Sequence, residues 1–334
     1  MNKNFLKTSD FSRSELEEII ETALKFKSGK LADKPLAGKS VALVFFNPSL
    51  RTRASMQVGV YELGGNPVVL EPGASSWTLE HVEGAVMDAD KTEHLKEFVR
   101  VLERYVAAIG VRTFAALQDW QTERTDPVLA AFARYAEKPV INLESAMHHP
   151  CQALADMMTV RERFGREKRR VLLTWAFHPK PLPMAVPNSF ALAAAQFGHD
   201  LRIAHPKGFE LDEELLSEIE AQAAENGGSL EIVNRADEAF RNVDVVYAKS
   251  WGSRLHYGNA NQDIRERQIY REKWIVDEQK MQQTNNAVFM HCLPVRRNVI
   301  VSDAVIDSPN SLVIDEAENR LHVQKAIMTR LVRG

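Results

Sequence analysis

Residues 41–53, with the sequence VALVFFNPSLRTR, decide the fold that we expect for this chain. Their first six residues are apolar, which predicts a strand that is buried on both faces, as strands of parallel sheets are. Asn47 and Pro48 break this strand, and the residues after them predict a helix that runs to Leu63. A buried strand followed directly by a helix predicts an α/β fold built on a parallel sheet.

The same alternation of short apolar runs and amphipathic stretches continues along the chain. Three further strands are expected at residues 68–70, 107–111 and 139–142, and they complete one doubly wound half. A helix over residues 151–164 then leads to a second half. In that half, strands are expected at residues 171–175, 201–204, 230–233, 243–247 and 288–291.

These two halves predict two doubly wound α/β domains with a cleft between them. Each domain has a central, mainly parallel sheet flanked by helices. The first domain is expected to comprise residues 1–150 and the second residues 151–315. The last helix, within residues 316–334, has no strand after it, so we expect it to return to the first domain. Ligands of such sheets bind beyond the carboxyl ends of the strands, where the candidate residues are therefore sought.

Charge and cysteine content limit the classes of function. The chain has 334 residues, a formal net charge of −3 and two cysteines, Cys151 and Cys292. This charge gives no electrostatic argument for nucleic acid or a membrane surface as a partner. Two cysteines indicate no disulfide framework, and no apolar stretch approaches the roughly 18 residues that a membrane helix needs. A cytoplasmic, soluble protein is expected.

Residues 49–53 lie where the first of these helices begins, which is a suitable place for a phosphate. A helix N-terminus offers backbone N–H groups and the positive end of the helix dipole. Ser49 and Thr52 add hydroxyl groups, and Arg51 and Arg53 add guanidinium groups that can bind phosphate oxygens in pairs. The alternative is a capped helix with two surface arginines.

Arg112 and His149 are the next candidates, because each follows an expected strand. A histidine at the start of a helix is held near neutral by the dipole and can donate a hydrogen bond to a carbonyl. His148 beside it raises the alternative of a metal site. Adjacent histidines are poorly placed to bind one ion, and no further histidine follows at helical spacing, so no metal is expected.

Residues 291–294, His-Cys-Leu-Pro, end another expected strand. Pro294 leaves the carbonyl of Leu293 without a strand partner and available to a ligand. Neighbouring strand residues point to opposite faces, so His291 is not expected to activate Cys292 as a nucleophile. Activation of Cys292 by another histidine, and a purely structural cysteine, remain alternatives.

Several charged residues close to the same strand ends could bind an anion or an amine, and each could equally be a solvated surface charge. These residues are Glu144, Lys249, Arg296, Arg297 and Arg320.

Together these segments resemble the motifs of the aspartate/ornithine carbamoyltransferase superfamily. Residues 49–53 resemble its S-x-R-T-R loop for carbamoyl phosphate, residues 149–152 its H-P-x-Q motif, and residues 291–294 its H-C-L-P motif. The three motifs occur in the order of the family, and the resemblance covers essentially the whole chain.

The resemblance is closer to the branch that acts on N-acylated ornithine. Residues 45–49 (FFNPS) and 315–320 (DEAENR) are similar to that branch. The D-x-x-x-S-M-G loop, which binds free ornithine in the ordinary ornithine enzyme, is replaced here by KSWG at residues 249–252.

Two positions indicate the acyl group. Thr92 stands where N-acetylornithine enzymes have a glutamate, which would repel a succinyl carboxylate, and where N-succinylornithine enzymes have a proline. Ile300 resembles the succinyl enzymes, whereas the acetyl enzymes carry a carboxylated lysine there. The expected acceptor is therefore N-succinyl-L-ornithine, with N-acetyl-L-ornithine as the alternative.

The resemblance implies a role for each candidate, in a reaction with carbamoyl phosphate that needs no cofactor. The expected catalytic residues are Thr52, Arg112, His149, Gln152 and Cys292. The expected carbamoyl phosphate contacts are Ser49, Leu50, Arg51, Thr52, Trp77, Arg112, His149, Gln152, Cys292, Leu293 and Arg320. The expected acylornithine contacts are Thr92, Glu144, His178, Lys249, Leu293 and Arg296.

The resemblance also implies a homotrimer in which Trp77 reaches the site of a neighbouring subunit; from the sequence alone, Trp77 would be packed within its own loop. Two functions of other classes compete with carbamoyl transfer. One is a cysteine-dependent amidohydrolase, and the other is a non-catalytic sensor of carbamoyl phosphate or another anion.

Overall fold

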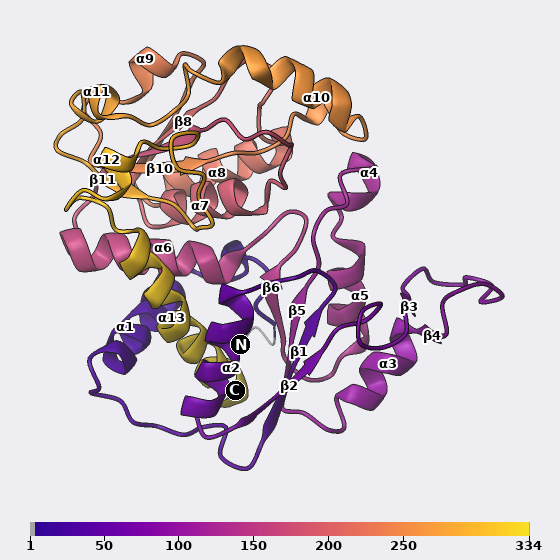
Figure 1. Ribbon diagram of the computed structural model, residues 1–334. Coiled ribbons are helices and arrows are strands. Elements are labelled where there is room, and N and C mark those ends of the chain that lie inside the picture. The colour runs from indigo at the N-terminus through magenta and orange to yellow at the C-terminus, as the bar shows by residue number, and fades with distance from the viewer. Residues whose placement is uncertain (1–3, 334) are drawn as a thin grey trace. The chain divides into compact units, whose positions relative to one another are not determined.

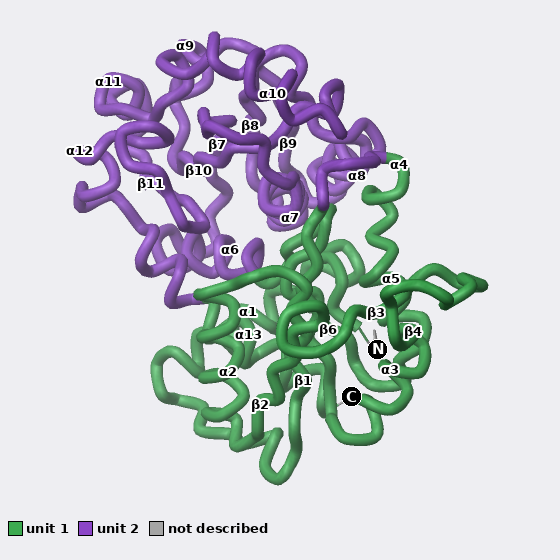
Figure 2. Tube along the Cα trace, turned by 45° about the vertical axis from the view of Figure 1, so that its right-hand side comes forward, with its two compact units in different colours: residues 1–115, 121–151, 320–334 green, residues 116–120, 152–319 purple. Residues whose placement is uncertain are grey.

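The computed structural model describes residues 4–333, which form two compact units (Figure 2). Of the described residues, 4–115, 121–151 and 320–333 belong to unit 1, and 116–120 and 152–319 belong to unit 2. Each unit has its own parallel sheet with helices packed on it, as the alternating sequence pattern predicts. No helix within residues 4–333 is long and apolar enough to cross a membrane.

Unit 1 is built on a four-stranded parallel sheet with the strand order β2-β1-β5-β6. Its strands are β1 (Ser40–Phe45), β2 (Asn66–Leu70), β5 (Ala108–Arg112) and β6 (Val140–Glu144). Its helices are η1 (Thr8–Asp10), α1 (Arg13–Lys27), α2 (Arg51–Glu62), α3 (Leu95–Leu102) and α5 (Pro127–Tyr135). The short strands β3 (Leu79–Glu80) and β4 (Glu93–His94) pair with each other.

Helices cover both faces of this sheet, as Figure 1 shows. Ala42 and Val44 of β1 belong to the apolar cluster that α3 and α5 cover. Strand residues alternate between faces, so Val41 and Leu43, which are also fully buried, face the opposite side. This double burial is the reason why residues 41–46 are almost continuously apolar.

The C-terminal helix α13 (Val313–Arg333) ends on unit 1, and the expected return of this helix is confirmed. Lys325 forms an ion pair with Glu62 of α2 at 2.5 Å, and Arg330 forms ion pairs with Glu15 and Glu18 of α1. The contact with α2 is close, because the Cα of Gly59 faces Lys325 and Met328 with room for little more than a Cβ.

Unit 2 is built on a five-stranded parallel sheet with the order β11-β10-β7-β8-β9. Its strands are β7 (Arg170–Trp175), β8 (Asp200–Ala204), β9 (Ser229–Val233), β10 (Val245–Lys249) and β11 (Val288–Met290). Helix α7 (Ala185–Gln196) is buried over its whole length, and α8 (Glu213–Glu225) packs against it. The other helices are α6 (Pro150–Phe164), α9 (Ala236–Ala239), η2 (Arg254–His256), α10 (Ala260–Arg267), η3 (Gln268–Tyr270), α11 (Glu278–Met281) and α12 (Asp303–Ile306). The chain passes from one unit to the other within α6 and within α4 (Trp120–Glu123).

Two strand ends next to candidate residues in unit 2 differ from the expected ones. Strand β10 extends to Lys249, and β11 ends at Met290. His291 and Cys292 are therefore not strand residues. They do not point to opposite faces of a sheet, as was predicted, because the strand pairing stops before them.

Candidate functional site

The start of α2 in unit 1 has the features expected of an anion site. Strand β1 ends at Phe45 and α2 begins at Arg51, so Ser49 and Leu50 lie in the connecting loop. The N-cap residue Leu50 makes no side-chain hydrogen bond to the first turn, and 80% of its surface is exposed. The first backbone N–H groups of α2 are thus not capped by that side chain, which favours an anion there.

Three residues from distant parts of unit 1 meet at this helix start. The Thr52 hydroxyl oxygen accepts a hydrogen bond from Nη2 of Arg320 at 2.9 Å and faces Nη1 of Arg112 at 3.4 Å. All three side chains are buried. Burial lowers the pKa of Arg112, the charge of Glu144 raises it in part, and the charges of Arg320 and Arg51 lower it again. Two further guanidinium groups therefore act on Arg112, and this positive charge suits a phosphate.

Glu144 is the carboxylate of this cluster. Its Oε2 accepts from Nη1 of Arg112 at 2.7 Å and lies 3.4 Å from Nε2 of His149. The structure thus brings Arg112 and His149 together at one carboxylate, and the same Nη1 of Arg112 faces the Thr52 hydroxyl. Glu144 was expected to contact the acceptor, and that role remains a prediction, because here the residue pairs with Arg112.

Asp126 holds the loop that leads to His149, and this residue was not predicted from the sequence. Its carboxylate accepts from the Ser145 hydroxyl at 2.7 Å and from the backbone N–H groups of Ala146 (2.7 Å) and Met147 (3.3 Å). The Asp-Pro step before α5 would suggest a helix cap, but Asp126 makes no side-chain cap. It binds a loop about 20 residues further along the chain instead, so no local signal could have identified it.

This carboxylate gives a prediction for stability against pH. Burial raises the pKa of Asp126 from 3.8 to about 6. A carboxyl group whose pKa is higher in the folded state contributes stability below its unfolded pKa, and this contribution is lost as the pH rises through 6. Asp126→Asn has no such ionisation. Between pH 4 and pH 7, the free energy of unfolding of wild type should fall relative to the variant by up to about 3 kcal/mol. Urea unfolding at both pH values measures the difference, and a pH-independent difference would contradict the prediction.

Trp77 and Thr92 lie close together, because parallel pairing of β3 with β4 joins their segments. The indole N–H of Trp77 donates to Oε2 of Glu93 at 2.8 Å, and 57% of the Trp77 side chain is exposed. Thr92 is also exposed. The role of Trp77 in a neighbouring subunit remains a prediction.

In unit 2, Gln152 and the segment after β11 are joined by Glu316. The Gln152 amide nitrogen donates to Oε1 of Glu316 at 3.0 Å, and Oε2 of Glu316 accepts from the His291 backbone N–H at 2.9 Å. Cys292 is half-buried, and Leu293 has a φ of 53°, which is unusual for a leucine.

The rival pairing of His291 with Cys292 receives no support from this segment. Nδ1 of His291 accepts a hydrogen bond from the Leu293 N–H at 2.9 Å. In a neutral ring Nε2 then carries the proton, so the lone pair that a general base needs is already used.

Two expected acceptor contacts, His178 and Arg296, meet in unit 2. Nε of Arg296 donates to Nε2 of His178 at 2.9 Å. Nδ1 of His178 lies 2.8 Å from the carbonyl oxygen and 3.1 Å from the backbone nitrogen of Lys180, and the tautomer decides which of these two contacts forms. Burial lowers the pKa of His178, and the charges of Arg296 and Lys249 lower it further. Burial and these charges thus favour the neutral imidazole at His178, which Arg296 contacts directly.

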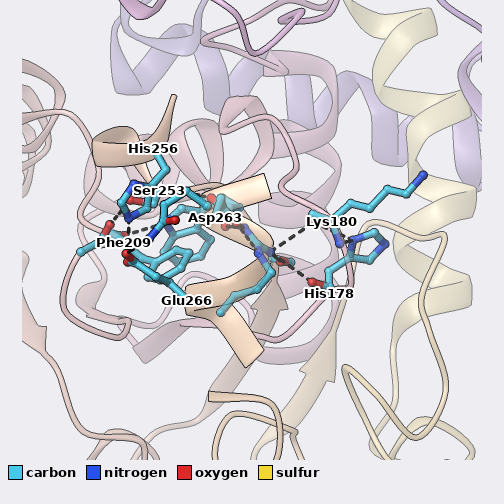
Figure 3. A network of polar contacts seen from close by, with 12 residues as sticks. His178, Lys180, Phe209, Ser253, His256, Asp263 and Glu266 are labelled. Carbon is cyan, nitrogen blue, oxygen red and sulfur yellow. Dashed lines mark hydrogen bonds and ion pairs between the residues drawn. The ribbon is translucent and has the colours of Figure 1, made fainter. Parts of the chain in front are cut away.

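A buried ion pair supports the loops that carry these residues (Figure 3). Arg267 of α10 is fully buried and paired with Asp263 one turn before it. Nη1 of Arg267 donates to the carbonyls of His178 (3.2 Å) and Lys180 (3.1 Å), and Nη2 donates to the carbonyl of Trp251 (3.3 Å). This pair was not predicted from the sequence, because Asp and Arg four residues apart are typical of an exposed helix surface.

Comparisons with known proteins give the same family for both units. Residues 3–162 match the family model described as "Aspartate/ornithine carbamoyltransferase, carbamoyl-P binding domain". Residues 184–331 match the model described as "Aspartate/ornithine carbamoyltransferase, Asp/Orn binding domain".

Named relatives cover nearly the whole chain. The chain is 50% identical to the N-acetylornithine carbamoyltransferase of Xanthomonas campestris pv. campestris, over 99% of this chain and 98% of the relative. It is 40% identical to the N-succinylornithine carbamoyltransferase of Bacteroides thetaiotaomicron, over 89% of this chain and 88% of the relative.

Solved structures give the same result. The complex of acetylornithine transcarbamylase with acetylcitrulline has a TM-score of 0.96 and 49% identity, and the match covers 99% of both chains. A second structure is a variant of N-acetyl-L-ornithine transcarbamylase with a glutamate replaced by alanine, in complex with carbamyl phosphate and N-succinyl-L-norvaline. It has a TM-score of 0.95 and 50% identity, and the match covers 99% of this chain and all of that chain.

Proposed function

Because the chain belongs to the aspartate/ornithine carbamoyltransferase family, we propose that it transfers the carbamoyl group of carbamoyl phosphate to the δ-amine of an N-acylornithine. The products are an N-acylcitrulline and phosphate, as in arginine biosynthesis. The observation that carries this proposal is the buried cluster of Thr52, Arg112 and Arg320 at the start of α2.

The phosphate group is bound in unit 1. The N–H groups at the start of α2 and the side chains of Ser49, Arg51 and Thr52 surround it, and the two buried arginines neutralise its charge. Phosphate leaves as an anion, so the same positive charges stabilise the leaving group.

In the chemical step, the neutral δ-amine attacks the carbonyl carbon of carbamoyl phosphate. Thr52, Arg112 and His149 donate to the carbonyl oxygen while it carries negative charge. The bond from carbon to the phosphate oxygen then breaks, phosphate takes the electron pair, and the nitrogen of the new C–N bond passes one proton to the departing phosphate. Gln152 and the backbone of Cys292 and Leu293 accept hydrogen bonds from the N–H groups of the reactants. Alignment of the two substrates contributes most of the acceleration.

The acyl group is the finer part of the proposal. The relatives at 47–50% identity are N-acetylornithine enzymes, and the N-succinylornithine enzymes are more distant, at 39–40%. This favours N-acetyl-L-ornithine over the succinyl acceptor that the sequence motifs predicted.

Thr92 supports N-succinyl-L-ornithine as a second candidate. Variants of the N-acetylornithine enzyme with one glutamate replaced by alanine, proline, valine or serine have been solved with N-succinyl-L-norvaline. Thr92 stands where those enzymes have a glutamate, and it carries no charge to repel a succinyl carboxylate. Ile300, at the other position, is buried and uncharged.

Product formation from carbamoyl phosphate with N-acetylornithine, N-succinylornithine and free ornithine in parallel tests the proposal. Turnover of at least one acylated acceptor, with little turnover of free ornithine, is expected. Turnover of neither acylated compound would refute the proposed function and favour the anion-sensor alternative.

Thr92→Glu should act selectively on the succinyl acceptor. A carboxylate at this exposed position would repel the succinyl carboxylate, so kcat/KM for N-succinylornithine should fall by about 10-fold or more, while that for N-acetylornithine changes little. Thr92→Gln, which has the same length without charge, is the control. Equal losses with both acceptors would show that Thr92 does not face the acyl group.

We also propose a homotrimer to which Trp77 contributes across subunits, on the basis of the family resemblance and the exposure of Trp77. Light scattering measures the oligomeric state.

A further inference from the structure

Two buried carboxyl groups lie beside Gln152 in unit 2. They belong to Asp156 on α6 and Glu316 on α13, and both residues have no exposed surface. The Gln152 amide nitrogen donates to Oδ1 of Asp156 at 2.7 Å and to Oε1 of Glu316 at 3.0 Å. Both hydrogens of this nitrogen are therefore engaged by carboxyl oxygens.

These contacts determine which way the Gln152 amide faces. In the reverse orientation, the amide oxygen would lie against two acceptors, which is unfavourable in a buried site. Any contact that the Gln152 amide makes with a ligand is consequently through Oε1, which is an acceptor.

The second oxygen of Glu316 organises the segment after β11. It accepts from the backbone N–H of His291, and the His291 ring in turn accepts from the N–H of Leu293. Glu316 thus joins Gln152 on α6 to the backbone of the His-Cys-Leu-Pro segment.

The environment keeps a proton on this pair. Burial, followed by the charges of Asp156 and Cys292, raises the pKa of Glu316 well above its ordinary value. Tyr247 also faces this group, and burial and the nearby carboxyl groups raise its pKa as well. Two adjacent buried carboxyl groups cannot both ionise at low cost, so the pair retains a proton near neutral pH.

We propose that the Asp156–Glu316 pair is a positioning element for carbamoyl transfer. It presents the Gln152 oxygen as an acceptor and fixes the backbone of Leu293, so that the N–H groups of the carbamoyl donor and of the attacking amine meet acceptors in fixed positions. This inference rests on the proposed function, because it assigns these acceptors to the reactants of that transfer.

Glu316→Gln tests the pair with almost no change in volume. The single carbonyl oxygen of the new side chain cannot accept from both Gln152 and His291. In one of the two contacts, its amide N–H group therefore faces another N–H group. We expect kcat to fall by about 10- to 100-fold, with the KM for the acylornithine nearly unchanged, and the dissociation constant of carbamoyl phosphate to rise by about 10-fold. An unchanged kcat and an unchanged dissociation constant would overturn the proposal.

A second substitution should rescue the first. In Gln152→Glu combined with Glu316→Gln, the amide nitrogen introduced at position 316 can donate to the new carboxylate at position 152, while the amide oxygen accepts from His291. The cluster again contains two carboxyl groups, and position 152 again presents an acceptor. The double variant should have a kcat about 10-fold above that of either single variant. A loss equal to the product of the two single losses would overturn the proposal.

The matched control is Thr159→Val. The Thr159 hydroxyl accepts from Asn319 at 2.9 Å, so this contact joins the same two helices, α6 and α13, without touching Gln152. The kcat of Thr159→Val should stay within about 2-fold of wild type. A loss equal to that of Glu316→Gln would show that helix packing, and not acceptor positioning, explains the effect.

Two further measurements separate a failure of this inference from a failure of the proposed function. If Glu316→Gln does not fold, Asp156→Leu removes the second acceptor of the Gln152 amide, which Asn would keep, and leaves the His291 contact. An unchanged kcat in that variant would overturn the proposal. Wild type that binds carbamoyl phosphate but turns over no acylornithine would refute the acceptor, while the dissociation constants would still test the pair. Wild type that does not bind carbamoyl phosphate would overturn both.

Discussion

Arg112→Met is expected to lower kcat/KM for carbamoyl phosphate by about 10³-fold or more. Loss of one donor to a developing oxyanion costs roughly 10²- to 10³-fold, and Arg112 is expected to contact the phosphate as well. The substitution also leaves the carboxylate of Glu144 without its partner at 2.7 Å, which adds negative charge where an anion must bind. Steady-state kinetics with carbamoyl phosphate as the varied substrate measures the loss.

Two controls separate this loss from a general effect of charge. Arg112→Lys keeps the charge but cannot reach both Thr52 and Glu144 with a guanidinium, so an intermediate loss is expected. Arg13→Met removes an arginine that pairs with Glu17 on α1, in a partly exposed ion pair, and should have little effect. A kcat/KM of Arg112→Met within about 10-fold of wild type would rule out the proposed phosphate site.

Asp263→Leu is expected to have the largest effect on stability. Arg267 has no exposed surface, and burial already lowers its pKa, so removal of its carboxylate leaves a desolvated charge without its ion-pair partner. Breaking such a pair costs about 3–5 kcal/mol. Oδ2 of Asp263 also accepts from the Ser253 N–H at 2.7 Å, and this contact is lost too. Urea unfolding of wild type and variant measures the decrease.

The double variant Asp263→Leu/Arg267→Met separates stability from positioning. Replacing both charges by apolar side chains should recover much of the lost stability. It does not restore the hydrogen bonds from Arg267 to the carbonyls of His178 and Lys180. The KM of the double variant for the acylornithine should therefore stay above that of wild type. In contrast, Asp237→Ala, which breaks an exposed ion pair with Arg235, should change stability little. A double variant with a normal KM would show that the pair has no role in acceptor binding.

The strand-to-helix unit at residues 41–53 illustrates what local sequence can predict. Burial on both faces of a parallel sheet requires an apolar run, and a helix start that binds an anion requires hydroxyl and guanidinium groups close together in sequence. These requirements act on neighbouring residues, so the α/β class could be predicted, and the phosphate loop remains a prediction of the same kind. The return of the last helix was predicted because no strand follows it. The motifs around His149 and Cys292 were likewise visible as short patterns.

The partners of those residues were determined by the tertiary structure alone. Gln152 and Glu316 are 164 positions apart, Arg320 and Thr52 are 268 apart, and Arg267 reaches a carbonyl 89 positions away. Asp126, Asp156 and Asp263 have no unusual local pattern, because an aspartate beside a helix is most often a cap or a surface charge. Their importance arises from burial, which removes water and makes each hydrogen bond partner necessary. Burial of this kind depends on how segments that are distant in the sequence pack together, and hydrophobic periodicity carries no information about which polar groups will meet there.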